Sequence, residues 1–184
     1  MSTTHLTPTR TTPSLTRRAA QATAVGVVTS TVFVGATFGF YYAWVCSTMW
    51  GLDAADPRVA IAAMQAMNAS VRNPVFFPVF FLTPAIALIT AGLSWVAGLS
   101  RAAALLLGAG ILTLFGSVML TTWLNVPLND ALALVNVPAD VETARAIWTE
   151  YSTAWQARNI TRTVVSGVAL TLCALAALAM RRPR

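Results

Sequence analysis

Charged side chains divide the chain into long apolar runs and short polar connections. Four runs contain no charged residue, and they cover residues 19–52, 73–100, 102–129 and 163–180. A helix needs about 20 residues to cross a hydrocarbon layer of roughly 30 Å, and each run approaches or exceeds that length. The pattern therefore predicts four membrane-spanning helices, at about residues 22–48, 74–98, 102–124 and 160–180.

The connection between the first two spans, residues 53–72, has apolar residues at helical spacing. Asp53 or Asp56 could cap a helix here, and Pro57 fits its first turn. On a helical wheel one side carries Met64, Met67, Asn68 and Val71, and Gln65 and Arg72 flank it. We predict a short amphipathic helix at the membrane interface. The fold class is then all-α, an integral membrane four-helix bundle formed by residues 19–184, preceded by a disordered cytoplasmic tail, residues 1–18.

Polar residues stop the apolar pattern after the third span. Residues 125–130 read Asn-Val-Pro-Leu-Asn-Asp, which predicts a turn whose polar groups need nearby partners. A helix is predicted from Val141 into the fourth span. One face of that helix, within an arc of roughly 80°, carries Trp148, Tyr151, Trp155, Asn159, Arg162, Ser166 and Cys173. Aromatic stripes usually pack, but an arginine and an asparagine near a bilayer edge indicate a functional site.

Composition and charge narrow the class further. With 57% hydrophobic and 10% charged residues, the chain does not fit a soluble domain. All six acidic residues fall on one side of the predicted bundle. The other side carries only arginines, so the positive-inside rule predicts a multi-pass protein of the cell membrane with both termini in the cytoplasm. The partner is then the lipid bilayer. No basic stripe interleaved with aromatic residues indicates a nucleic-acid partner.

Several standard chemistries are disfavoured by the residues that the chain has. The only histidine is His5, in the predicted tail, so a metal site built on imidazole is not expected. Cys46 and Cys173 are predicted at different depths, which disfavours a disulfide. No glycine-rich phosphate loop or dinucleotide fingerprint occurs.

Three groups of residues carry a resemblance to a known family. They are the run 64–68 (Met-Gln-Ala-Met-Asn) with Asn73-Pro74, the run 125–129 (Asn-Val-Pro-Leu-Asn), and the series from Trp148 to Arg162. In this order they resemble the anthrone oxygenase family, also known as DUF1772, whose members are small four-span membrane proteins. Many members have Trp-Asn-His before the arginine, whereas this chain has Arg158-Asn159-Ile160. The histidine that could act as a base in those members is missing here.

The resemblance implies a membrane-bound monooxygenase of secondary metabolism. Such an oxidoreductase oxidises an activated polycyclic phenol or ketone with dioxygen as co-substrate and without a conventional cofactor. By this resemblance, Arg162, Asn159, Asn125 and Asn129 are the catalytic candidates. The candidates for binding a lipophilic small molecule are Trp148, Tyr151, Trp155, Asn68, Gln65 and Met64. For the base, Glu150, Asp130 and Asp53 stay open.

A second interpretation assigns no catalysis to these residues. Under it, the chain is a membrane module that binds a lipophilic ligand or a partner protein, and the polar residues hold the helices together. An open aromatic pocket around Arg162 would favour the enzyme, and a closed, packed cluster would favour the module. The sequence leaves open the substrate, the oligomeric state and an unconventional cofactor.

Overall fold

A computed structural model describes residues 15–180 of the chain, and within this range every regular element is a helix. Three of the elements are short π-helical segments, labelled η. In chain order they are α1 (Leu15–Ala43), η1 (Trp44–Thr48), α2 (Met49–Ala54), α3 (Pro57–Ser70), α4 (Phe76–Val96), α5 (Ser100–Thr113), η2 (Leu114–Met119), η3 (Thr121–Asn125), α6 (Val126–Ala133) and α7 (Val141–Ala179).

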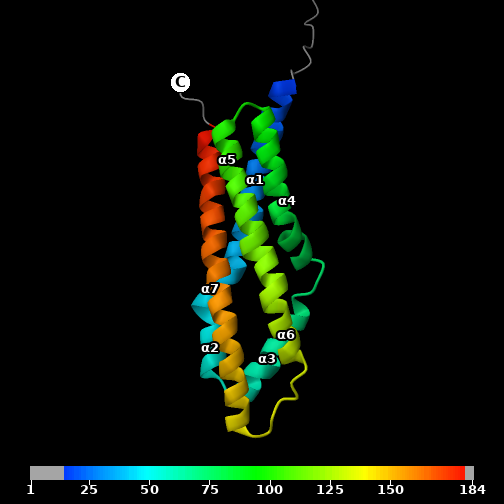
Figure 1. Cartoon of the computed structure of the whole chain (residues 1–184), viewed down its shortest axis with the longest axis vertical. Helices are drawn as coiled ribbons and strands as arrows, with labels where there is room; N and C mark the ends of the chain where they lie inside the picture. Colours follow the sequence, from blue (N-terminus) through cyan, green and yellow to red (C-terminus); the bar gives the residue numbers. More distant parts are fainter. Residues whose placement is uncertain (1–14, 181–184) are drawn as a thin grey trace, which may run out of the picture.

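The long helices form the predicted four-helix bundle. Four helical stretches are long and apolar enough to cross a membrane, namely Ala20–Ala54, Phe76–Val96, Ser100–Ala133 and Val141–Ala179. α1 packs against α4 and α7, and α5 packs against the same two helices, so the bundle is four-cornered. The first and last described residues lie at the same end of it (Figure 1). The prediction of an all-α, four-span membrane protein is confirmed.

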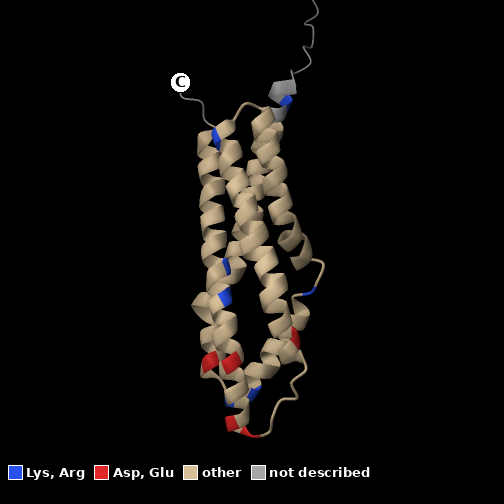
Figure 2. Ribbon diagram, viewed as in Figure 1, with Lys and Arg blue, Asp and Glu red and all other residues tan. Residues whose placement is uncertain are grey.

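The bundle is longer than a membrane is thick. α7 has 39 residues, which corresponds to about 58 Å at 1.5 Å per residue and to nearly twice a hydrocarbon layer of roughly 30 Å. In Figure 2 the acidic residues of the described chain lie toward the end opposite the termini. The half with the termini is therefore the apolar one, and the orientation of the termini in the membrane stays a prediction.

Carboxylates cap two helices at the charged end. The Asp56 side chain accepts a hydrogen bond from the backbone N–H of Arg58 at 2.9 Å, and Pro57 occupies the first turn of α3. Hydrogen bonds from the Arg58 side chain and N–H lower the pKa of Asp56 from 3.8 to about 2. Asp140 caps α7 by accepting from the Thr143 N–H at 2.8 Å. Bonds from the Thr143 hydroxyl and N–H lower the pKa of Asp140 as well.

The prediction of a turn at residues 125–130 is wrong. Residues 125–130 form no turn, because the helix continues through η2 and η3 into α6, where Pro127 takes a first-turn position that requires no N–H donor. α1 begins at Leu15, inside the predicted tail, and the predicted disorder of residues 1–14 lies outside the described residues. 

The helix predicted between the first two spans is present as α3. Its Met64 is fully buried in a core cluster with residues of α6 and α7. The apolar face of α3 thus packs on protein, and a position at the membrane interface is not confirmed.

Glycine allows α4 and α5 to approach closely. A Cβ atom at Gly110 of α5 would lie 2.7 Å from both Cγ and Cδ2 of Leu88 and 3.3 Å from the Leu88 backbone nitrogen. A Cβ atom at Gly92 of α4 would meet nothing within 4 Å. The two positions therefore form a matched pair.

We expect Gly110→Ala to lower the free energy of unfolding by about 1–3 kcal/mol, because the extra methyl group must separate α5 from α4. Gly92→Ala should be neutral or stabilising by up to about 1 kcal/mol, since alanine favours the helix. Unfolding in detergent, followed by circular dichroism, measures both. Equal stabilities for the two variants would contradict the close contact.

Candidate active site

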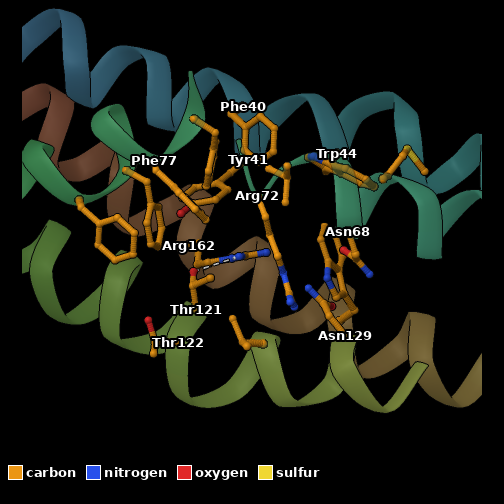
Figure 3. A pocket seen from close by; sticks show the side chains of 17 residues that line it. Phe40, Tyr41, Trp44, Asn68, Arg72, Phe77, Thr121, Thr122, Asn129 and Arg162 are labelled. Carbon is orange, nitrogen blue, oxygen red and sulfur yellow. Dashed lines mark hydrogen bonds between the residues drawn. The ribbon is translucent and has the colours of Figure 1, made fainter. Parts of the chain in front are cut away.

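A cavity of about 260 Å³ lies where α1, α3, α4, η3 and α7 meet. Two of the π-helical segments, η1 and η3, contribute residues to its wall, and such segments are frequent at functional sites. The cavity is lined by Phe40, Tyr41, Trp44, Met67, Asn68, Val71, Arg72, Phe76, Phe77, Phe80, Phe81, Thr121, Thr122, Val126, Asn129, Trp155 and Arg162. In Figure 3, Phe77 and Thr122 lie at one end, and Asn68 and Asn129 lie at the other.

Eight of the 17 lining residues are aromatic. Phe76 stacks on Phe80 with ring centroids 5.3 Å apart, and the Phe40 ring lies 5.1 Å from the Phe76 ring. On another side the Trp44 and Trp155 rings lie 5.0 Å apart. Flat apolar rings pack favourably against such surfaces. The shape and composition of the wall therefore suit a planar aromatic molecule.

Arg162 is the one charged group that is buried in this wall, within the described part of the chain. Its side chain is only 5% exposed. Nη1 donates to the Thr121 hydroxyl at 3.1 Å, and Nη2 donates to Oδ1 of Asn159 at 2.9 Å. The guanidinium carbon lies 4.6 Å from the Tyr41 ring centroid and 5.3 Å from that of Trp155. These partners are neutral, so the positive charge of Arg162 lacks a carboxylate among the described residues.

Asn159 fixes the Arg162 guanidinium from outside the cavity. Its Oδ1 accepts from the guanidinium, while its Nδ2 donates to the Tyr41 carbonyl at 3.1 Å, which ties α7 to α1. The Tyr41 hydroxyl in turn shares a hydrogen bond of 2.8 Å with the Ser117 hydroxyl on η2. Asn159 does not line the cavity, so it is a positioning residue.

The other end of the cavity is polar. The Tyr151 hydroxyl donates to Oδ1 of Asn129 at 2.8 Å and accepts from Nδ2 of Asn68 at 3.2 Å, which joins α3, α6 and α7. Arg72 lines the cavity here and forms an ion pair with Asp130, which is outside the lining. Both side chains of this pair are about half exposed, so this end reaches water.

Asn125 and Trp155 have polar atoms without hydrogen-bond partners among the described residues. Asn125 is fully buried, and neither its Nδ2 nor its Oδ1 is bonded; the same holds for Nε1 of Trp155. Thr121 lies one turn before Asn125 and bonds Arg162 of α7. Asn129 lies one turn after Asn125 and bonds Tyr151 of α7. Along the axis of α7, Asn125 is therefore level with Trp155. Buried polar groups usually have a partner. Of these two residues, Trp155 lines the cavity and Asn125 does not.

The predicted site residues fall into three groups. Arg162, Asn129, Trp155 and Asn68 line the cavity. Asn159 and Tyr151 bond residues of the wall, and Asn125 is fully buried outside the lining. The rest hold the fold: Trp148 donates to Asp53 at 2.9 Å, Gln65 donates to the Leu132 and Val135 carbonyls, and Met64 is buried in the core. The predicted stripe on α7 is confirmed, since all seven of its residues are buried.

The phenylalanines of α4, Arg72 and Thr121 line the cavity but were not predicted as site residues from the sequence. Residues 76–81 read Phe-Phe-Pro-Val-Phe-Phe, which repeats the rings at i and i+4 and so lines one helix edge with them. That density of rings was a usable signal. Thr121 gave no such signal, because only the fold brings it to Arg162 of α7. Arg72 flanked the apolar face predicted for residues 53–72, but only the fold brings it to the cavity.

Acidic residues are absent from the lining, as far as the structure describes the chain. Asp53 accepts hydrogen bonds from Trp148, Ser152 and Gln156, outside the cavity. Glu150 lies on a separate surface hollow. Within residues 15–180 no three histidine, cysteine or acidic side chains cluster as metal ligands would.

The fold and the cavity define a four-span membrane protein with an aromatic internal site and a buried arginine. Residues 72–172 match the family model described as anthrone oxygenase. Because this match covers more than half of the sequence, the chain belongs to the anthrone oxygenase family. Neither the curated proteins nor the solved structures gave a match.

Proposed function

We propose that the protein binds a planar polycyclic phenol or ketone as its anion and oxygenates it with dioxygen, as in the conversion of an anthrone to an anthraquinone. The observation that carries this proposal is Arg162, a buried cation with neutral partners, held against aromatic rings in a cavity. A buried charge is costly without a counter-ion. The enolate of an anthrone supplies both the missing negative charge and the flat rings.

The reaction balances without a redox cofactor. The methylene carbon of the anthrone loses a proton, and the resulting electron-rich anion is oxidised by dioxygen. In total this carbon gives up two hydrogens and gains one oxygen atom as a ketone. The second oxygen atom leaves as water with the two hydrogens. Dioxygen is thus the oxidant and the only co-substrate, and no conventional cofactor is part of the proposal.

Each residue around the cavity has a role in this scheme. Arg162 stabilises the oxyanion that forms when the proton leaves, as preorganised donors do in other enzymes. Asn159 and Thr121 fix the guanidinium, and the rings of Trp155 and the α4 phenylalanines hold the substrate. Asn125 is fully buried and outside the lining, so it acts on the substrate only through the wall, as a positioning residue. The proton passes to water at the polar end beside Arg72, since none of the carboxylates in residues 15–180 lines the cavity.

Binding without catalysis is the second candidate, and the open cavity supports it as well. Oxygen uptake with emodin anthrone, using purified protein in detergent, separates the two. Uptake above the spontaneous rate, lost in Arg162→Ala and Asn125→Ala while both stay folded, supports the oxygenase. Correctly folded wild type that binds the anthrone without extra uptake is a binding module instead.

The orientation in the membrane is part of the same proposal. We propose that both termini face the cytoplasm of a cell membrane, because only arginines flank the spans at that end. The cavity then lies toward the outer face. The test is labelling of Ser100→Cys, at the first residue of α5, with an impermeant reagent in a Cys46→Ser background, because the native Cys46 is exposed. Labelling of intact cells would reverse the assignment.

Asp130 is the acidic residue nearest to acting as a base, because its partner Arg72 lines the cavity. We expect Asp130→Asn to change oxygen uptake by no more than about fivefold, as for an exposed ion pair worth about 0–1 kcal/mol. Glu150→Gln is the matched control outside the cavity. A loss of about 100-fold or more in Asp130→Asn alone would make Asp130 the general base.

A further inference from the structure

Five of the residues that line the cavity are exposed, namely Phe40, Arg72, Phe77, Phe81 and Thr122, and the last three lie along one side of the bundle. Phe77 and Phe81 are 41% and 52% exposed, and Thr122 is exposed opposite them. The two phenylalanines belong to α4 and the threonine to η3, and both elements lie within candidate membrane spans. The cavity is therefore open at its side, between α4 and η3.

The depth of this opening follows from the length of α4. Its 21 residues extend about 31 Å, which matches a hydrocarbon layer of roughly 30 Å. Phe77 is at one end of α4, and the 71% exposed Trp95 is at the other. Trp123, next to Thr122, is 67% exposed. Because exposed tryptophans favour the two membrane interfaces, the opening lies at the edge of the hydrocarbon layer.

The surface of the opening is apolar even at its threonine. The Thr122 hydroxyl donates to the Val118 carbonyl of its own helix at 2.9 Å, so its hydrogen bond is made internally. Phe77 and Thr122 lie at the end of the cavity away from Asn68 and Asn129 (Figure 3). One end of the cavity thus suits hydrocarbon, and the other suits water.

We propose that the cavity opens sideways into the membrane between α4 and η3, and that a flat, uncharged polycyclic aromatic molecule reaches Arg162 from the lipid through this opening. The inference rests on the proposed function for the identity of the ligand. An uncharged anthrone dissolves in lipid and enters the cavity between Phe77 and Thr122. It loses its proton only after its oxygen contacts Arg162. The polar end by Arg72 then exchanges protons with water.

A neighbouring groove provides the control. It has a volume of about 410 Å³ and lies between α1 and α4, on the far side of Phe40, Phe76 and Phe80, which line both spaces. Phe76 is stacked on Phe80 and tilted against Phe40. Trp44, Met67 and Val71 also line both spaces, so the groove adjoins the cavity. Val79 lines the groove and not the cavity, so a bulky residue there leaves the opening free.

The test compares Thr122→Trp with Val79→Trp and Thr122→Val in lipid nanodiscs. Two quantities are measured: the association rate of anthraquinone, which binds without turnover, and the kcat and KM of anthrone oxidation. A ring at position 122 fills the opening, so we expect the association rate to fall at least about tenfold, with KM raised and kcat changed less than about threefold. Thr122→Val and Val79→Trp should behave as wild type.

Each outcome has a distinct meaning. Unchanged association in Thr122→Trp would overturn the inference, and slow association in Val79→Trp would place the route in the groove instead. Loss of kcat with normal association in Thr122→Trp would also contradict it, because the residue would then act on the reaction. Wild type that binds no anthraquinone and oxidises no anthrone would refute the proposed function itself, which is a separate result.

Discussion

Arg162→Met is expected to abolish anthrone oxidation, with a loss in kcat of at least about 100-fold, as on removal of an oxyanion donor. The same variant should fold as well as wild type or better. Methionine fills similar space between Tyr41 and Trp155 and removes a buried charge that has only neutral partners. Oxygen uptake and thermal unfolding in detergent measure the two effects.

Activity and stability together distinguish a catalytic role of Arg162 from a purely structural one. If Arg162 only held the helices together, methionine would lower stability, and any loss of activity would follow unfolding. Arg158→Met is the matched control, since Arg158 lies one turn earlier on α7, outside the cavity, and donates to the Leu124 carbonyl. Arg162→Lys should recover part of the activity, because it restores the charge without the planar fork. Full activity in Arg162→Met would exclude the oxyanion role.

Thr121→Asp should lower the affinity for an anionic aromatic ligand by about 10- to 100-fold, in line with about 1.5–3 kcal/mol for a hydrogen bond to a charged group. The Thr121 hydroxyl accepts from Nη1 of Arg162 at 3.1 Å. A carboxylate at this position would supply a counter-ion from the protein itself and so compete with the substrate anion. Titration with an anthrone under argon, where no oxidation occurs, measures the affinity.

Thr121→Asn is the control for this variant, because it has the same shape as aspartate and carries no charge. We expect Thr121→Asn to keep most of the affinity that Thr121→Asp loses, which is about 10- to 100-fold. The aspartate variant should also be the more stable of the two, since Arg162 gains a charged partner. Equal affinities in the two variants would show that the charge of Arg162 does not bind the ligand.

The sequence determined the elements of the bundle because they depend on local pattern. Uncharged runs of membrane length predicted the four spans, and the spacing from Trp148 to Arg162 predicted a single buried face on α7. Asp53 or Asp56, with Pro57, predicted the start of α3, and the structure has Asp56 as its cap. The resemblance carried by these motifs also gave the family, which the match over residues 72–172 shows.

The turn predicted after Asn125 failed for a physical reason. Asparagine and proline favour turns when they are considered locally, yet both are tolerated where a helix passes through a π-helical segment into a new first turn. That choice depends on what the neighbouring helices offer. Here η3 and α6 remain helical because Thr121 and Asn129 bond Arg162 and Tyr151 on α7.

Only the tertiary structure decided which residues form the site. It brought Arg72 and the α4 phenylalanines to the cavity. It placed Trp148, Gln65 and Met64 in contacts that hold the fold. Periodicity states which face of a helix is buried, but not whether that face meets another helix or an open space. The distance between helices sets that difference, and it depends on close contacts such as Gly110 with Leu88, far along the chain from Arg162.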